Sequence, residues 1–127
     1  MNIVGTGIDI VETARLSEAI QRHGERFLAR IFTDGERQYC AGSKRPETFY
    51  AARFAAKEAV SKAFGTGIGS QLGWLDIEVR RKATGEPFIV LHGVGAATAR
   101  RLGIADLRVT MSHSEHYAVA HALALGT

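Results

Sequence analysis

Three charged side chains stand out in this sequence. Asp9 interrupts the apolar stretch NIVGTGIDIV, and Glu58 and Lys62 lie four residues apart in the alanine-rich stretch ETFYAARFAAKEAVSKAF. A carboxylate within an apolar strand is costly unless a cation or hydrogen-bond donors compensate it. Asp9 therefore either has such a partner or lies at the strand end and caps the next helix. Magnesium takes one or two protein carboxylates plus substrate phosphate oxygens, and lysine supplies a positive charge to phosphate. These residues indicate a divalent-metal phosphate site.

A glycine-rich loop follows the lysine. The string GTGIGSQLG places four glycines within residues 65–73, which no helix or strand interior tolerates. Glycines also let backbone N–H groups approach phosphate oxygens. The loop matches neither GxxxxGK[ST] nor GxGxxG in a strand–helix setting, so nucleotide-hydrolase and dinucleotide-binding folds are poorly supported. The alternative interpretation of Glu58 and Lys62 is an exposed, salt-bridged helix face.

The opening segment is predicted to be a strand that carries Asp9. Its apolar alternation gives a packed face and a nearly bare face, and the bare face carries Gly5, Gly7 and Asp9. Because glycine has no side chain, this face has room for a ligand or for another backbone. The face expected to be packed carries Val4, Thr6, Ile8 and Ile10.

Three helices are expected next. The first begins at the N-cap candidate Thr13 and runs to residue 31, with a kink or break at Gly24. Thr33 and Glu36 have the spacing of a capping box and start a short second helix. The third, 47–64, ends before Gly65 and carries Glu58 and Lys62. A turn of about 100° per residue directs one set of its side chains to the core and another to the opposite side. The core set is Ala55, Ala56, Ala59, Val60, Ala63 and Phe64, and the opposite set is Phe54, Lys57, Glu58, Ser61 and Lys62.

The remainder predicts a sheet and one more helix. Segments 74–80 and 87–92 flank a turn and read as a β-hairpin, 94–103 reads as a helix, and 107–114 and 117–125 read as final strands. In the last segment alternate alanines form a smooth face on which a helix can lie closely, although alanine and leucine also suit one terminal helix. The expected fold is α+β, a small antiparallel sheet packed against a long helix, in a single domain of residues 1–127.

Four arginines recur along the first predicted helix. Arg15, Arg22, Arg26 and Arg30 fall within about 80° of arc if the helix continues through Gly24. They form either a solvated face or a surface that docks an acidic protein. Nucleic acid is the weaker choice, because the net charge is only +3 and no aromatic-rich strand motif accompanies the arginines.

Three histidines lie near the C-terminus, in the string SHSEHYAVAH, at spacings that match no usual zinc motif. A core or hydrogen-bonding role is the ordinary interpretation of each. His113, between two serines at a strand end, is the one singled out for an anionic ligand.

Length and composition set the remaining limits. The 127 residues are enough for one core without metal or disulfide, and the single Cys40 favours a reducing compartment. No apolar run reaches membrane-spanning length and no secretory signal opens the chain, so we expect a cytoplasmic protein with no membrane partner.

Two long strings resemble the short class of bacterial 4′-phosphopantetheinyl transferases, the holo-[acyl-carrier-protein] synthases. They are GIDIVETAR at residues 7–15 and FAAKEAVSKAFGTGIG at residues 54–69, in the family's order and interval, and the SHS triplet at 112–114 fits the family's late strand. The resemblance covers essentially the whole chain. It implies magnesium-dependent transfer of 4′-phosphopantetheine from coenzyme A to a serine of apo-acyl carrier protein, releasing adenosine 3′,5′-bisphosphate.

The resemblance also implies roles for individual residues. Asp9 and Glu58 would hold magnesium, with water in place of the further carboxylate that larger relatives have at the position of Val11. Lys62 would neutralise the pyrophosphate. The general base would be Glu58 or a metal-bound water or hydroxide. Coenzyme A contacts are expected from Arg53, Lys62, Gly65, Thr66, Gly67 and His113, and carrier-protein contacts from Arg15, Arg22, Arg26 and Phe54.

Family members form homotrimers with active sites at subunit boundaries, so the resemblance implies the same assembly here. Two rival functions are a non-enzymatic module that docks an acidic protein through the arginine helix, and a magnesium-dependent phosphotransferase acting on a free nucleotide. The first tolerates loss of Asp9 and Glu58, and the second needs no carrier protein.

Overall fold

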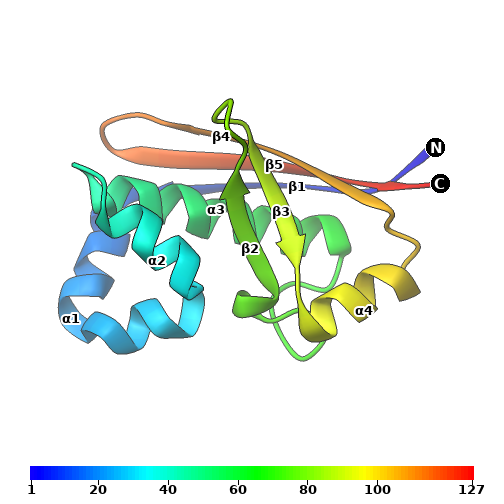
Figure 1. Ribbon diagram of the computed structural model, residues 1–127, viewed down its shortest axis with the longest axis horizontal. Coiled ribbons are helices and arrows are strands. Elements are labelled where there is room, and N and C mark those ends of the chain that lie inside the picture. The colour runs from blue at the N-terminus through cyan, green and yellow to red at the C-terminus, as the bar shows by residue number, and fades with distance from the viewer.

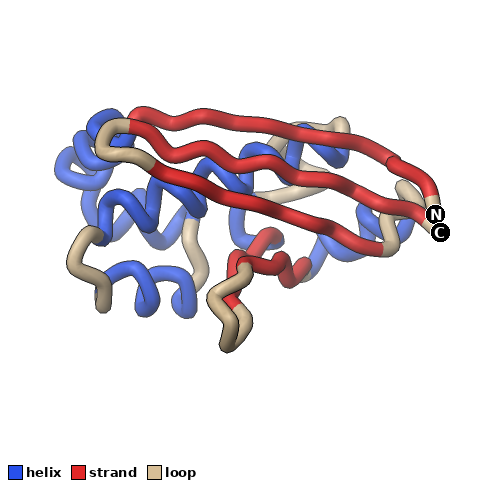
Figure 2. Tube along the Cα trace, turned by 90° about the horizontal axis from the view of Figure 1, so that it is seen from above, coloured by secondary structure: helices blue, strands red, loops and turns tan.

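The opening segment and the last two segments form one antiparallel sheet. In the computed structural model, which describes residues 1–127, strand β1 spans Asn2–Glu12, β4 spans Asp106–His113 and β5 spans Tyr117–Gly126. Their order is β1-β5-β4, so the two ends of the chain pair with each other. Figure 2 shows the three strands as one layer above the helices. The predicted α+β class is confirmed, and the alternative of one C-terminal helix is wrong.

The long helix α3 (Pro46–Phe64) lies along the inner face of this sheet (Figure 1). The alternate alanines of β5 make the close contact that their pattern predicts, and they are at most 1% exposed. In β1 the glycines face the helix, where a Cβ on Gly5 or Gly7 would lie 2.0 Å from the Ala63 carbonyl oxygen and 1.9 Å from that of Ala59. The glycine face was expected to leave room for a ligand or for another backbone, and it is the backbone of α3 that lies there. The residues facing the helix are Gly5, Gly7, Ala118, Ala120, Ala122 and Ala124.

The expected packing of β1 is reversed. Ile8 and Ile10, predicted to be on a packed face, are 62% and 65% exposed, whereas Gly7 is buried. The reason is that helix and strand backbones approach most closely where neither carries a bulky side chain, so the small residues turn inward. The larger side chains are left on the outer face of the sheet.

The helix α1 (Thr13–Ile31) is two helices joined at a kink. Gly24 has φ 58° and ψ −138°, outside the helical region, so it breaks the element as its composition suggested. The N-cap is Glu12 without a side-chain cap, and Thr13 is the first helical residue, so the predicted cap position is wrong by one residue. The helix α2 (Asp34–Ala41) begins with the predicted capping box of Thr33 and Glu36.

The core face of α3 is wider than predicted. Its apolar side is buried as expected, but Lys57 and Ser61, which the helical periodicity placed on the opposite side, are 0% and 1% exposed. The Lys57 side chain reaches the carbonyl oxygens of Ile31 and Trp74, because α1, α2 and the segment at Trp74 cover α3 as well as the sheet does.

The remaining elements cover the other end of α3. A 3₁₀ turn, η1 (Trp74–Asp76), leads into the hairpin of β2 (Ile77–Arg81) and β3 (Pro87–Leu91), and helix α4 (Gly93–Arg101) follows. The hairpin and the helix were predicted, but residues 74–76, expected to begin the first strand of the hairpin, form the 3₁₀ turn instead. Both chain termini lie at the same end of the sheet (Figure 1). None of the helices combines the length and apolarity that crossing a membrane requires.

Candidate active site

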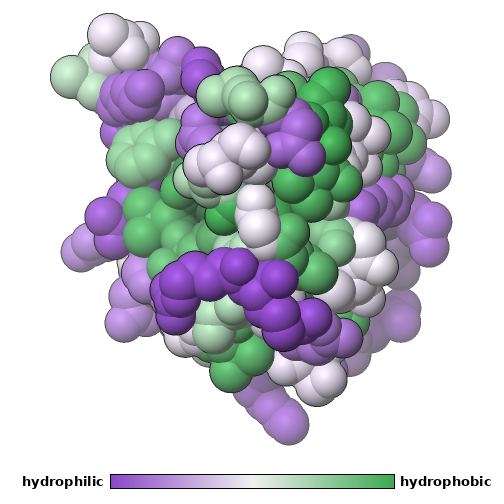
Figure 3. All heavy atoms as spheres, turned by 90° about the vertical axis from the view of Figure 1, so that its right-hand side faces the viewer, coloured by the Kyte–Doolittle hydropathy of each residue, from purple (hydrophilic) through white to green (hydrophobic).

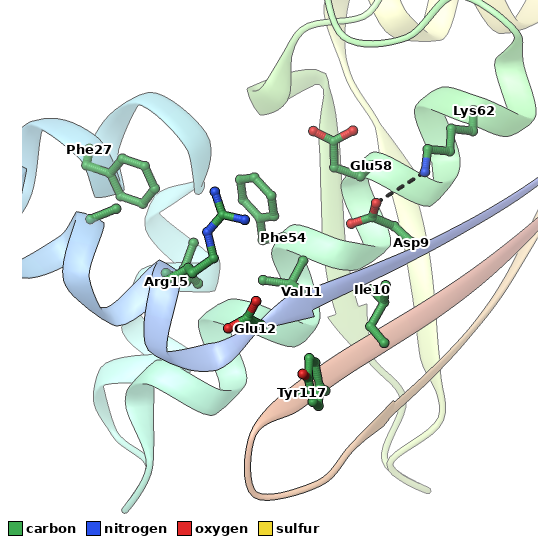
Figure 4. A pocket seen from close by; sticks show the side chains of 12 residues that line it. Asp9, Ile10, Val11, Glu12, Arg15, Phe27, Phe54, Glu58, Lys62 and Tyr117 are labelled. Atoms are coloured by element: carbon green, nitrogen blue, oxygen red, sulfur yellow. Dashed lines mark hydrogen bonds and ion pairs between the residues drawn. The ribbon is translucent and has the colours of Figure 1, made fainter.

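A pocket of about 600 Å³ opens where β1, α1 and α3 meet. It brings Asp9 from β1 together with Glu58 and Lys62 from α3 (Figure 4). Asp9 is more than 45 residues from either of the other two in the sequence. Phe54 and Arg15 also line it. The complete lining is Asp9, Ile10, Val11, Glu12, Arg15, Leu16, Ala19, Phe27, Phe54, Glu58, Lys62 and Tyr117.

Lys62 bridges the strand and the helix. Its Nζ donates to the Ile8 carbonyl oxygen at 2.8 Å and to Asp9 Oδ1 at 3.2 Å. The Asp9 side chain is 18% exposed and that of Lys62 is 51% exposed, so the pair is reachable from solvent. Asp9 therefore has a cationic partner rather than capping the next helix, and Lys62 keeps a solvent-facing side.

Glu58 makes no ion pair and faces the same pocket. Burial, and next the negative charge of Asp9, raise the pKa of Glu58 above its ordinary value of 4.5, and Lys62 opposes this only in part. A raised carboxylate pKa beside a second carboxylate marks a place where an additional positive charge is favourable. The donor set therefore fits a divalent cation with few protein ligands. No group of three or more histidine, cysteine or acidic side chains is arranged to hold a metal ion.

The other half of the pocket is apolar. Phe54 stacks on Trp74, with ring centroids 5.0 Å apart and an interplanar angle of 28°. Phe27 from the second half of α1 lies across from Phe54, and Arg15 extends its guanidinium into the space between them (Figure 4). A ligand whose anionic group lies at Asp9, Glu58 and Lys62 could therefore extend an apolar part into this cleft, beside the cation of Arg15.

The glycine loop closes the end of α3 just beyond Lys62. Gly65 and Gly67 have φ of 80° and 67°, and their N–H groups donate to the carbonyl oxygens of Lys62 and Ser61. These two donors are used to terminate the helix. Of the predicted triplet, the Thr66 N–H is the one that remains for a ligand, and the triplet does not line the pocket.

Arg53 and His113 lie away from this pocket, on the side of α3 that faces α2 and β4. Arg53 is 1% exposed, its guanidinium carbon lies 4.4 Å from the centre of the Tyr39 ring, and its Nε and Nη1 have no hydrogen-bond partner. Tyr39 stacks on Phe49 at 5.8 Å, and Phe49 lies 6.4 Å from the His113 ring. These four side chains form a continuous row. The structure therefore does not bring Arg53 and His113 together with Asp9 within one chain.

The arginines of α1 do not form one stripe. The break at Gly24 separates Arg15 and Arg22 from Arg26 and Arg30, so the single narrow face predicted for a continuous helix is wrong. All four are exposed, and Arg22 pairs with Glu18 at 3.2 Å. Arg15 lines the pocket, and Arg22 lies about two helical turns farther along the same half-helix.

Several pocket residues were not found from the sequence. Leu16 and Phe27 lie at helical spacings, and periodicity does not distinguish a residue that lines a cleft from one that fills a core. Glu12 lies within the string GIDIVETAR but was given no role, and Tyr117, its partner across β1 and β5, lies in neither of the two long strings. The lining residues that were predicted from the sequence to belong to the site are Asp9, Arg15, Phe54, Glu58 and Lys62.

Comparison with known proteins gives a consistent result. The family described as the 4′-phosphopantetheinyl transferase superfamily matches residues 5–122. A holo-[acyl-carrier-protein] synthase of Koribacter versatilis is 49% identical over 118 residues, which cover 93% of this chain and 94% of the relative.

Two crystal structures are similar over nearly the whole chain. The holo-[acyl-carrier-protein] synthase of Neisseria meningitidis has a TM-score of 0.93 at 31% identity and covers 98% of this chain and 99% of its own. That of Helicobacter pylori, in complex with coenzyme A, has a TM-score of 0.85 at 32% identity and covers 94% and 99%.

Proposed function

Since the chain belongs to the 4′-phosphopantetheinyl transferase superfamily, among its holo-[acyl-carrier-protein] synthases, we propose that the pocket at Asp9, Glu58 and Lys62 is its transfer site. The enzyme transfers 4′-phosphopantetheine from coenzyme A to a serine of apo-acyl carrier protein and releases adenosine 3′,5′-bisphosphate. The observation that carries the assignment of the site is the meeting of two carboxylates from separate elements beside a lysine. We propose that residues 1–127 form the single domain that carries out this reaction. The cytoplasmic location stays a prediction.

Asp9 and Glu58 would hold magnesium, which would bind the pyrophosphate oxygens and neutralise charge that develops during transfer. Two carboxylates suffice for an ion that usually keeps several waters. The raised pKa of Glu58 beside Asp9 supports this assignment, because a bound cation would relieve the repulsion between the two groups.

Lys62, which lies beside Asp9, would neutralise the negative charge of the pyrophosphate. Its present contact with Asp9 holds the ammonium over the pocket, and its exposed side leaves it free to turn toward a ligand oxygen. The serine oxygen attacks the phosphorus that bears the pantetheine arm, and the bond to the bridging oxygen of adenosine 3′,5′-bisphosphate breaks. The serine proton would pass to Glu58 or to a metal-bound water or hydroxide held by Asp9 and Glu58.

The far end of coenzyme A would reach Arg53 and His113 of a neighbouring subunit. The guanidinium of Arg53 has two N–H-bearing atoms without partners in a buried position, which is costly unless an anion completes them. The 3′-phosphate supplies such an anion. Because Arg53 and His113 lie outside the pocket of their own chain, a complete site requires a second copy.

A homotrimer would supply that second copy. The outer face of the sheet is uncovered and carries large apolar side chains, among them Ile8 at 62%, Ile10 at 65% and Tyr117 at 47% exposure. Figure 3 shows further hydrophobic patches between hydrophilic side chains at the end of the molecule near both termini. Exposed apolar area of this kind is typical of an interface.

The carrier protein would dock on α1. Arg15 supplies positive charge at the pocket, Arg22 and Arg26 are exposed cations farther along α1, and Phe54 lies in the cleft between α1 and the carboxylates. Charge complementarity with an acidic carrier would steer its serine toward Glu58.

The reaction is tested by intact-mass measurement of the carrier. Purified protein, coenzyme A, magnesium and apo-acyl carrier protein are incubated with and without a chelator. We expect a gain of about 340 Da on the carrier that the chelator abolishes, as metal-assisted transfer requires. A gain that persists in chelator and survives Glu58→Gln would contradict the proposed metal site.

A further inference from the structure

The most buried charges in the molecule are not those of the pocket. Lys57, the residue before Glu58, and Glu36 form an ion pair with Nζ 2.7 Å from Oε1, and both side chains are 0% exposed. The Lys57 Nζ also donates to the carbonyl oxygens of Ile31 at 2.8 Å and Trp74 at 3.0 Å. An ammonium has three hydrogens, and here each has one acceptor.

The three acceptors come from three different elements. Ile31 is the last residue of α1, Glu36 is in α2, and Trp74 begins η1. Glu36 in turn accepts from the N–H groups of Thr33 and Val79, so the pair also holds the start of α2 and strand β2. Lys57 therefore joins to α3 nearly every element that covers the side of the helix away from the sheet.

Two of these acceptors belong to segments that shape the pocket. The Trp74 ring stacks on Phe54, which lines the pocket, and α1 supplies the opposite wall through Leu16 and Phe27. Lys57 holds the carbonyl of Trp74 and the C-terminal carbonyl of α1 from a position adjacent to Glu58 in the chain. Lys57 therefore connects both of these walls to the helix that carries Glu58, although its own side chain does not line the pocket.

Stability alone does not account for such a pair. Desolvating two charges opposes folding, and replacing a buried ion pair by apolar residues of similar volume is often neutral or stabilising, whereas removing one partner is strongly destabilising. Burial lowers the pKa of Lys57, and Glu36 opposes that shift, so the charged form is held at a cost. An apolar side chain could not make the directional hydrogen bonds by which Lys57 connects three elements.

We propose that Lys57 is a positioning residue for phosphopantetheine transfer, which sets the distance of α1 and of the Trp74–Phe54 stack from Glu58 by holding Ile31, Glu36 and Trp74. This role rests on the proposed function of the pocket. Lys57 affects how the substrates bind between α1 and α3 rather than the chemistry at Asp9 and Glu58.

The test uses two variants of the full-length protein. Lys57→Met alone leaves Glu36 charged and unpaired, and the double variant Lys57→Met/Glu36→Gln neutralises the pair while the glutamine oxygen still accepts a backbone N–H. The readouts are the denaturation midpoint, the KM values for coenzyme A and carrier, kcat, and the emission of Trp74, the only tryptophan in the chain. Arg100→Met, which removes an exposed cation on α4, is the control and should match the unmodified protein.

We expect the double variant to be more stable than Lys57→Met, yet to have a KM for carrier raised at least tenfold, a smaller change in kcat, and a red-shifted Trp74 emission. A double variant that matches the unmodified protein within twofold in both KM values and in emission overturns the proposal. If neither variant folds in buffer, both are assayed in an osmolyte that strengthens burial, where the same comparison decides. Absence of transfer by the unmodified protein would instead refute the proposed function.

Discussion

Asp9 and Glu58 place two negative charges in one pocket, where Lys62 balances only part of them. If this arrangement binds a cation, as proposed, Asp9→Asn and Glu58→Gln should each lower the transfer rate by about 100-fold or more through loss of charge stabilisation. The urea midpoint of metal-free Glu58→Gln should be unchanged or higher, since the carboxylate is partly desolvated and repelled by Asp9. Glu47→Gln, an exposed carboxylate in the first turn of the same helix, is the matched control. A full rate in Glu58→Gln would rule out its role.

Glu78 connects a second group of charges, away from the pocket. Burial by itself would raise its pKa, but hydrogen bonds with His92, Arg80 and Thr33 outweigh burial and lower the pKa below the ordinary 4.5. A depressed carboxylate pKa contributes stability that is present above the unfolded-state pKa and is lost as the pH falls through the folded-state value.

The free energy of unfolding should therefore decline as the pH is lowered below about 4.5, and Glu78→Gln should flatten that part of the profile. Urea denaturation at a series of pH values measures both. Replacing the exposed Glu86, whose carboxylate pairs with Lys82 at the surface, serves as comparison and should have little effect on stability. Equal acid sensitivity of the Glu78→Gln variant and the unmodified protein would show that Glu78 does not carry the effect.

At the scale of elements, the fit of β1 onto α3 depends on glycine. A Cβ on Gly7 would lie 1.9 Å from the Ala59 carbonyl oxygen, which is part of the helix backbone and cannot turn aside. Gly7→Ala should therefore destabilise the protein by about 1–3 kcal/mol or more, because the strand must move away from the helix. Since Asp9 lies on that strand and Glu58 on that helix, activity should fall as well.

Gly69→Ala provides the control, because that position has open space and an ordinary φ. Chemical denaturation of both variants gives the comparison. A Gly7→Ala protein as stable as Gly69→Ala would mean that β1 and α3 are less closely packed than the structure shows.

The half of α1 before Gly24 carries Arg15, which lines the pocket, and the exposed Arg22, so the proposed carrier docking should depend on it. Arg22→Glu reverses an exposed charge whose contact with Glu18 contributes little to stability. We expect the KM for carrier to rise roughly 3- to 10-fold at low salt, with a smaller change at high salt and none in the KM for coenzyme A. Arg100→Glu on α4 is the control, and an equal effect of both reversals would indicate a general charge effect instead.

At the scale of the whole molecule, one chain holds the carboxylates in one place and the unpartnered Arg53 in another. If the uncovered sheet face joins copies, Ile8→Glu should dissociate the proposed trimer by placing a charge within an apolar interface. Sedimentation velocity measures the assembly, and the transfer assay should show a parallel loss of activity. Val94→Glu, at a similarly exposed apolar position on α4, should leave both unchanged. An active monomer would mean that a single chain completes the site.

The sequence alone indicated a metal and phosphate site, resembled one family in two long strings, and predicted most of the elements. Charges in apolar or alanine-rich surroundings identified Asp9, Glu58 and Lys62, because their cost demands a reason that local composition does not supply. Capping and turn residues located α2, the end of α3 and the hairpin for a similarly local reason, since a cap or a positive φ depends on a few neighbouring residues.

Only the tertiary structure decided which faces are covered and which distant residues meet. Periodicity distinguishes the two sides of β1, but glycines, not isoleucines, face the helix because backbone approach outweighed side-chain burial there. Lys57 reads as a surface residue until α1, α2 and η1 are seen to surround it. The separation of Arg53 from Asp9 likewise depends on the covering of all sides of α3, a non-local property that no window of sequence contains.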